Sequence, residues 1–359
     1  MAGECLASPS FDGSASTPLR TKFVHFGITG CSGGLDGLNL DERLALIEEA
    51  ELLGFESIWL NEEHFVNEDR LCLSPIPLLS YLAGRTERLR LGFSVLQLPF
   101  HNPLRLAEDI ATLDVLSRGR VEFGISRSGN EVYHRGFGIP SSERTERFDE
   151  GLECIETFWH AEEPVSHHGK FWNFDRVVIS PPPYQRPHPP IHIGARNHDS
   201  VKRVARGGYL LIEGVVQAIT YTRTDIAAFR EGAAEAGRTV GPADISIGRY
   251  VFVAETDSRA IEESRPVIAG VAEGMLTSPH LALGFVLDKE HLELERFTRE
   301  FAIVGSPDTV AARIEKLHEE LGFGRFNCGF GLTGRATPDQ VFRSLRLFGK
   351  EVIPALAGS

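Results

Sequence analysis

The sequence predicts an α/β fold, a (β/α)8 barrel in which eight parallel strands alternate with eight helices. Short apolar runs recur along the chain, and segments with helical periodicity follow them. Polar residues gather where the apolar runs end, as at Asn61–His64 and Ser126–Arg127. In a parallel barrel these strand ends face one mouth, where active sites are built. We therefore expect the functional residues to come from several distant parts of the chain.

The first half of the chain supplies four strand–helix pairs. Glycines at 54 and 119 stop helical patterns, and prolines at 75 and 103 stand at positions that suit the first turn of a helix. The expected strands are Phe23–Thr29, Gly54–Leu60, Leu89–Val95 and Val121–Ile125. The expected helices are Asp41–Leu53, Pro75–Arg85, Pro103–Leu116 and Glu143–Trp159.

The second half supplies four more pairs. The expected strands are Ile191–Gly194, Tyr209–Ile212, Ile245–Val253 and Phe326–Phe330. Helices are expected after Ser200 up to Gly207, over Tyr221–Ala236, from Ser306 onward and over Thr337–Ile353. Eight strands and eight helices are the number that a closed barrel needs.

We expect one barrel domain over residues 21–357, preceded by a disordered leader at 1–20 that is rich in Ser, Gly and Thr. Insertions are expected at the mouth, at about residues 128–142, 163–189 and 257–301. The segment 128–140 is expected to be a loop. Prolines in 167–189 exclude a central strand and predict a flap or a short hairpin beside the barrel. The length of 257–301, which has helical character, indicates a cover over the substrate.

The amino-acid composition limits the kinds of molecule that the protein is expected to bind. A net charge of −13 argues against nucleic acid or an anionic membrane surface. The five cysteines are scattered and never spaced as C-x-x-C, which fits a reduced cytoplasm and predicts neither disulfides nor a metal site. No apolar run approaches the roughly 18 residues needed to cross a bilayer. A cytoplasmic protein that acts on a small molecule is the expectation.

Four stretches point to a family. They are GFESIWLNEEHF, HNPLRLAEDIATLDVLSRGRVEFGISR, HHGKFWNFDRVVISPPPYQRPHPPIHIGA and the tail that begins VGSPDTVAARI. Together, in this order over roughly residues 23 to 356, they resemble the bacterial-luciferase-like, flavin-dependent monooxygenases. The resemblance implies a TIM barrel, reduced FMN and O2 as reactants, a separate flavin reductase as partner, and a homodimer formed through the second and third helices.

The resemblance also implies where the flavin lies. The Ser94–Val95 bond aligns with a non-prolyl cis peptide that lies against the flavin ring, and Arg127 aligns with a residue that reaches the phosphate. Arg144 and Arg147 are both candidates for a second phosphate clamp, and the loop length leaves the choice between them open.

A phosphate seat is also expected after the fifth strand. The backbone N–H groups of Arg196 and Asn197 follow Ala195, and the Ser200 hydroxyl is close by, at the start of a helix where anions bind favourably. Arg196 stands where luciferases have a carboxylate, and its positive charge favours phosphate further. Ser126, expected beside the ring, replaces a reactive cysteine of luciferase, which is compatible with oxygenation and argues against light emission.

The candidate catalytic residues are Glu63 and His64. The family often shows Glu-His-His where this chain has Glu62-Glu63-His64, so that Glu63 takes the place of the histidine implicated in acid–base chemistry. A carboxylate in an apolar mouth beside Glu62 can have a raised pKa and act as a base. His64 is the second candidate. Alternatively, only one of the two glutamates faces the cavity and the other forms a structural salt bridge.

Three functions are compatible with these observations. The first is a two-component monooxygenase, because the chain contains no G-x-G-x-x-G segment for binding NAD. The second is hydride transfer with the deazaflavin F420 on the same barrel. The third is a flavin-binding protein that has lost catalysis together with its histidine. Aldehydes, alkane-like compounds, amines and polycyclic intermediates all remain open as substrates.

Overall fold

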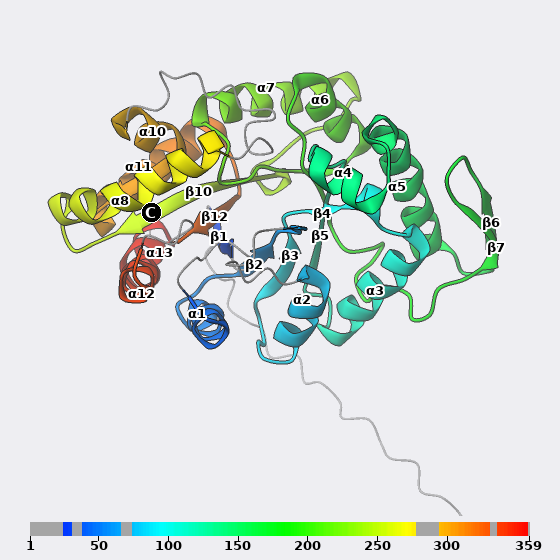
Figure 1. Ribbon diagram of the computed structural model, residues 1–359, viewed down its shortest axis with the longest axis horizontal. Helices are drawn as coiled ribbons and strands as arrows, with labels where there is room; N and C mark the ends of the chain where they lie inside the picture. Colours follow the sequence, from blue (N-terminus) through cyan, green and yellow to red (C-terminus); the bar gives the residue numbers. More distant parts are fainter. Residues whose placement is uncertain (1–23, 31–37, 66–73, 278–293, 331–335, 358–359) are drawn as a thin grey trace, which may run out of the picture.

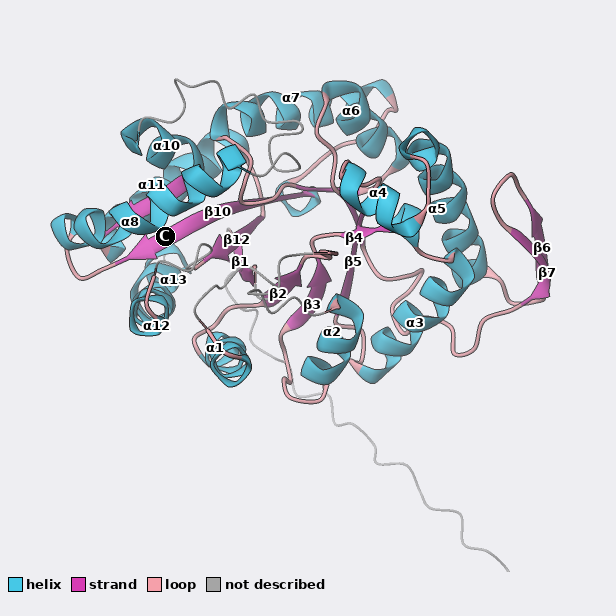
Figure 2. Ribbon diagram, viewed as in Figure 1, coloured by secondary structure: helices cyan, strands magenta, loops and turns pink. Residues whose placement is uncertain are grey.

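The computed structural model describes residues 24–30, 38–65, 74–277, 294–330 and 336–357. Eight parallel strands form a ring in the order β10-β12-β1-β2-β3-β5-β8-β9, which closes because β9 pairs with β10. Helices surround the ring (Figures 1 and 2). The predicted (β/α)8 barrel is confirmed. The expected leader lies outside the described residues.

The strands are short, as in most parallel barrels. The ring consists of β1 (His25–Thr29), β2 (Ser57–Leu60), β3 (Arg90–Phe93), β5 (Val121–Ser126), β8 (Ile191–Ile193), β9 (Leu210–Ile212), β10 (Ile245–Val253) and β12 (Arg325–Gly329). Two further strands join this sheet: β4 (Leu96–Gln97) pairs with β5, and β11 (Ala302–Gly305) pairs with the second half of β10.

Most helices begin at the capping residues and prolines visible in the sequence. The α-helices are α1 (Leu40–Leu52), α2 (Pro75–Ala83), α3 (Pro103–Leu116), α4 (Glu131–Phe137), α5 (Arg144–His160), α6 (His198–Gly207), α7 (Ile219–Glu235), α8 (Asp257–Thr277), α10 (Leu294–Phe301), α11 (Pro307–Leu321), α12 (Pro338–Leu347) and α13 (Ile353–Ala357). Short 3-10 turns are η1 (Leu98–Phe100), η2 (Ser141–Glu143) and η3 (Pro242–Asp244), and η5 (Phe348–Val352) is a π-helical turn. Within the described part of the chain, no helix is long and apolar enough to cross a membrane.

The insertions differ from the expectations in two places. The segment 128–140 is not a loop, because it contains α4, whose first turn is capped by the Asn130 side chain accepting from Val132 N at 2.9 Å. The short β11 was missed, because four apolar residues directly after a helix carry no periodicity of their own. The predicted hairpin is confirmed: β6 (Val165–His168) and β7 (Asn173–Val177) pair antiparallel and project from the edge of the molecule (Figure 1).

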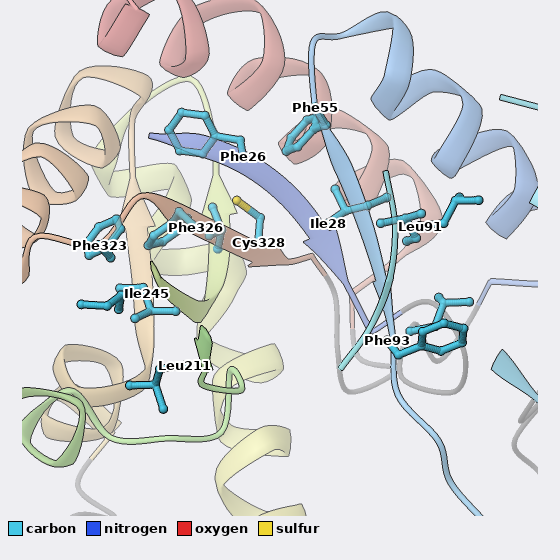
Figure 3. Close-up of a cluster of buried hydrophobic side chains, with 14 of the residues drawn as sticks. Phe26, Ile28, Phe55, Leu91, Phe93, Leu211, Ile245, Phe323, Phe326 and Cys328 are labelled. Carbon is cyan, nitrogen blue, oxygen red and sulfur yellow. The ribbon is translucent and has the colours of Figure 1, made fainter. Parts of the chain in front are cut away.

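The outer face of the ring carries the apolar core. Phe26 and Phe326 on neighbouring strands point to the helices, and the Phe26 ring lies 5.3 Å from that of Phe348 in η5. Figure 3 shows part of this cluster, which joins residues from distant strands and loops. Burial of these side chains between strands and helices is the main force that holds the barrel closed.

The inner face is different, because glycines there make room for one large side chain. Trp59 is fully buried, and a Cβ atom added to Gly92 on the next strand would collide with its indole ring. A Cβ on Gly27 would collide with Ser57 and Asn327. Glycine is required at both positions because the barrel interior is already filled.

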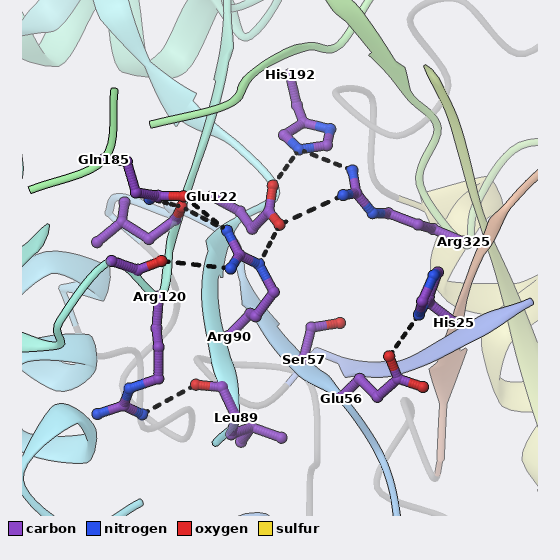
Figure 4. Close-up of polar contacts among 12 residues, drawn as sticks. His25, Glu56, Ser57, Leu89, Arg90, Arg120, Glu122, Gln185, His192 and Arg325 are labelled. Atoms are coloured by element: carbon purple, nitrogen blue, oxygen red, sulfur yellow. Dashed lines mark hydrogen bonds and ion pairs between the residues drawn. The ribbon is translucent and has the colours of Figure 1, made fainter. Parts of the chain in front are cut away.

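A charged network fills the interior at the N-terminal ends of the strands (Figure 4). The Glu122 carboxylate, 1% exposed, accepts hydrogen bonds from Arg90 Nε and from His192 Nε2 at 2.7 Å, and Arg325 Nη2 lies 3.5 Å away. Gln185 completes the network by accepting from Arg90 at 3.1 Å. Burial would raise the pKa of Glu122, but its hydrogen bond to His192 and the nearby arginines lower it to about 2. Glu122 is therefore ionised at every physiological pH.

We expect Glu122→Gln to destabilise the protein by about 3–5 kcal/mol, because it leaves buried guanidinium groups without their counter-charge. Urea unfolding at neutral pH measures this loss. Glu48→Gln is the matched control, since Glu48 pairs with Arg85 on the surface and its loss should cost less than about 1 kcal/mol. Equal losses in the two variants would contradict the central role of Glu122.

A second carboxyl group is buried just beyond the end of a barrel strand. Glu213 follows β9 and is 3% exposed. Burial raises the pKa of Glu213 to about 7 against the opposing effect of Thr222, while Asp225 adds to the rise and Arg249 opposes it. Because the pKa is raised in the folded state, the native protein holds a proton there that the unfolded chain has already lost between about pH 4.5 and 7.

Stability should therefore fall as the pH rises from 5 to 8. Glu213→Gln removes this dependence. As the pH rises from 5 to 8, the free energy of unfolding of the variant should therefore gain up to about 3 kcal/mol on that of the unsubstituted protein. Thermal unfolding of both proteins at pH 5, 6.5 and 8 measures the change. A constant difference between the two proteins across this range would show that Glu213 does not titrate there.

Candidate active site

The C-terminal ends of β2, β3, β5 and β8 meet at the mouth of the barrel. Ser94 N donates to Leu60 O at 2.7 Å, and Glu62 N to Val95 O at 3.3 Å. On the other side, Gln97 pairs in register with Ser126. The segments 61–64, 94–95 and 126–127 predicted from the sequence are therefore brought together.

The Ser94–Val95 peptide bond is cis, as the resemblance implied. Glycines on the neighbouring strands accommodate the turn: a Cβ on Gly124 would collide with the carbonyl of Phe93, and the Gly194 position lies 3.6 Å from Val95 Cγ1 and 3.7 Å from Ser126 Cβ. Val95 and Ser126 thus sit side by side over two glycines. Val95 and Ser126, both partly exposed, form what we call the floor of the mouth, and the buried Ala195 follows at the same strand end.

Glu62 is the best-connected carboxylate of the mouth. It is 8% exposed, and its Oε2 accepts from Gln97 N at 2.6 Å. Its Oε1 accepts from His101 Nε2 at 2.8 Å, and His64 Nε2 lies 3.4 Å from the same oxygen. Burial opposes ionisation, but the hydrogen bonds from His101, His64 and Gln97 lower the pKa of Glu62 to about 2. Glu62 is therefore a permanent anion, unsuited to accept a proton at neutral pH.

The two predicted catalytic residues lie on different sides of the rim. Asn61 Nδ2 donates to Glu63 Oε1 at 2.7 Å, so these two side chains share one side. The alternation that points Trp59 into the barrel makes this the inner side. His64 belongs to the outer side, where its ring lies 4.7 Å from that of Phe137 and 5.3 Å from that of Tyr133, both in α4. The structure thus separates Glu63 from His64 and groups His64 with Glu62.

The expected phosphate seat forms a cluster of cations. Asn197 caps α6 by accepting from Ser200 N at 2.9 Å, and the Ser200 hydroxyl receives a hydrogen bond from Arg127 Nη2. Arg203, one turn further along α6, bonds Asp149 at 3.1 Å. Burial together with Arg203 lowers the pKa of Arg127, Asp149 opposes this, and Arg144 adds to it. The positive charges of Arg203 and Arg144 are therefore both felt at Arg127.

The structure distinguishes between the two arginines that the sequence left open. Arg147 donates to Glu143 at 2.8 Å, and its guanidinium lies 4.4 Å from the centre of the Phe171 ring at the tip of the hairpin. Arg144 is the one whose charge acts on Arg127. Arg196 is exposed beside the start of α6.

Sequence reasoning missed Arg203 and Asp149, and it assigned no role in the site to His101. Arg203 could have been found, because it follows Ser200 by three residues in the same helix and so lies on the same face. The pairing of Glu62 with His101, 39 residues apart, left no comparable signal.

Comparison with known proteins shows the family and agrees with the fold. The family model described as luciferase-like monooxygenase matches residues 21–325. The chain belongs to this family. A solved structure with the same fold is the oxygenating constituent of 3,6-diketocamphane monooxygenase from Pseudomonas putida, in complex with FMN, with a TM-score of 0.77 and 20% identity over 92% of this chain and 98% of that one.

The family's relatives include both monooxygenases and F420 enzymes. The oxygenase component of a flavin-dependent trigonelline monooxygenase from Acinetobacter baylyi is 31% identical, over 47% of this chain and 46% of that protein, which is less than half of its length. An alkanal monooxygenase alpha chain from the Kryptophanaron alfredi symbiont is 26% identical over 93% and 98%. An F420-dependent glucose-6-phosphate dehydrogenase from Kineococcus radiotolerans is 28% identical over 86% and 90%. A luciferase-like oxidoreductase is therefore the function class.

The cation cluster predicts which arginines bind phosphate. We expect Arg127→Leu and Arg203→Leu each to weaken the binding of inorganic phosphate roughly 10- to 100-fold, as the loss of one charge-assisted hydrogen bond does. Arg147→Leu is the control and should bind as the native protein does, because that side chain is held by Glu143 and Phe171. Isothermal titration calorimetry measures all three variants, and an Arg147 effect as large as that of Arg203 would contradict the assignment.

Proposed function

We propose that the protein is an FMN-dependent monooxygenase that receives reduced FMN from a separate reductase and uses O2 to oxygenate a small organic substrate. The observation that carries this proposal is the charge of the cluster at the start of α6. Arg144 and Arg203 both act on the half-buried Arg127, and Asp149, which pairs with Arg203, opposes them, so that positive charge is in excess around Arg127. A phosphate monoester, such as the one that ends FMN, carries close to two negative charges at neutral pH.

The residues of the mouth fit such a cofactor. The Ser200 hydroxyl, the backbone N–H groups of Arg196 and Asn197, and the helix dipole all favour a phosphate at this end of α6. The floor formed by Val95 and Ser126 would support the flavin ring. Bound reduced flavin supplies the electrons for the reaction with oxygen, while the protein holds the phosphate, orients the ring and limits access of water.

We assign proton exchange with the substrate to Glu63, with His64 as the second candidate. Glu63 is held by Asn61 on the inner side of the rim, whereas His64 packs among aromatic rings on the outer side. An oriented carboxylate at the mouth can accept a proton from a bound substrate. Glu62 is excluded from this role because its pKa is about 2.

The partners follow from the relatives by analogy. Two of them are named as an oxygenase component and an oxygenating constituent, which supports a separate reductase. A homodimer is also proposed. Tyr81 of α2 and Val115 and Leu116 of α3 expose apolar surface, 64% in the case of Leu116, on the helices where the resemblance places the contact.

F420-dependent hydride transfer is the second candidate, supported by the dehydrogenase that resembles most of the chain. A flavin-binding protein without catalysis is a third candidate, which is favoured only if bound flavin reacts with oxygen no faster than flavin in solution.

We expect the protein to bind reduced FMN and to change its rate of oxidation by O2, which stopped-flow absorbance detects. Product formation with a panel of aldehydes, alkane-like compounds, amines and polycyclic phenols should then identify the substrate. The competing result is hydride exchange with F420 and no effect on FMN oxidation, which would replace the monooxygenase assignment.

Glu63→Gln should slow product formation roughly 100-fold or more, as the loss of a general base does. FMN binding should remain unchanged, because Glu63 is remote in its contacts from the phosphate cluster. His64→Gln provides the comparison for the second candidate. Native turnover in the Glu63 variant, measured at substrate saturation, would remove Glu63 from the mechanism.

A further inference from the structure

At the rim of the barrel mouth, a set of hydrogen bonds holds two segments of the chain together. The proposed reaction does not itself require these bonds. Glu62 is the residue that ties β2 to the segment after β3. In addition to its carboxylate contacts, its carbonyl accepts from Gln97 Nε2 at 2.9 Å, and its N–H donates to Val95 O at 3.3 Å. One residue thus makes three hydrogen bonds to Gln97 and Val95, on either side of Leu96.

Both carboxylate oxygens of Glu62 are occupied. Oε2 accepts from the backbone of Gln97, and Oε1 lies between the Nε2 atoms of His64 and His101. A carboxylate held in this way is anionic, buried and fixed in position. Because its partners outside its own segment lie in 95–97 and in the loop before α3, moving Glu62 would move the end of β2, the Ser94–Val95 peptide and that loop together.

We propose that Glu62 is a positioning residue that sets the floor for the flavin ring at the mouth of the barrel. It does so by holding the backbone of 94–97 against the rim, so that Val95 stays seated between Gly124 and Gly194. It also fixes the turn that carries Glu63 and Asn61 on the inner side. This inference deepens the proposed function and rests on it, because it concerns the ring end of the same site.

The phosphate end is built independently. In the described part of the chain, Arg127, Ser200 and Arg203 bond one another, Asn197 or Asp149, and none of them bonds Glu62, Gln97 or His101. A disturbance of Glu62 should therefore affect the ring and leave phosphate binding intact. This separation makes the inference testable without knowledge of the substrate.

The test compares Glu62→Gln with a matched control, Glu51→Gln. Glu51 also holds backbone N–H groups, those of Glu87, Arg88 and Leu89 at 3.1, 2.6 and 2.7 Å, but it does so before β3, at the opposite end of the barrel. Both variants should lose stability in thermal unfolding. Only Glu62→Gln should change the visible absorption spectrum of bound FMN and weaken FMN binding, by about 10- to 100-fold, as a small displacement of a binding surface does.

The affinity for inorganic phosphate, measured by competition, should be unchanged in both variants. If Glu62→Gln does not fold, His101→Leu provides the second variant, since it removes one partner and keeps the buried charge; it should show the same spectral change to a smaller extent. Native spectrum and native FMN affinity in the folded Glu62 or His101 variant would overturn the inference, as would an equal spectral change in Glu51→Gln.

Failure of the proposed function gives a different result, because the native protein itself would then show no FMN binding. In that case the same comparison is made with F420, whose ring occupies the corresponding end of the site. A native protein that binds neither cofactor overturns both the proposed function and the role of Glu62.

Discussion

The buried carboxylate of Glu122 is the constraint on which the barrel depends. Arg90, His192 and Arg325 reach it from three other strands, so that four of the eight strands meet at one charge inside the ring. A charged side chain is rarely buried away from water unless an opposite charge accompanies it. Here the Glu122 carboxylate at the centre supplies that opposite charge. The network fills one end of the barrel, and the proposed site lies at the other end.

A second buried carboxylate, that of Glu62, organises the mouth of the barrel. There Glu62 accepts hydrogen bonds from His101 and from a backbone N–H, with His64 Nε2 at 3.4 Å, and it links segments rather than strands. Glycines at 124 and 194 then leave space for the chain to turn across the opening and to seat Val95. The mouth is thus a rigid floor with a few aimed polar groups, which is how binding sites for planar cofactors are generally built.

The distribution of charged side chains over the protein suits the proposed cofactor. The protein as a whole carries −13, yet the positive charges of Arg144 and Arg203 act together on Arg127, opposed by Asp149. Such a local excess in an acidic protein is costly unless an anion completes it. A phosphate group at this position would satisfy the cluster, and the half-buried Arg127 would gain the most.

The sequence by itself determined the barrel and most of its strands, and a family resemblance carried by short motifs implied the position of the cis peptide. These features depend on local periodicity, on capping residues and on short motifs such as those around Ser94 and Arg127. The tertiary structure alone decided which arginine joins the cluster, that α4 packs against His64, and that Glu62 is the anion of the rim. These contacts join residues far apart in the chain, and they depend on distance and burial, which a linear pattern does not record.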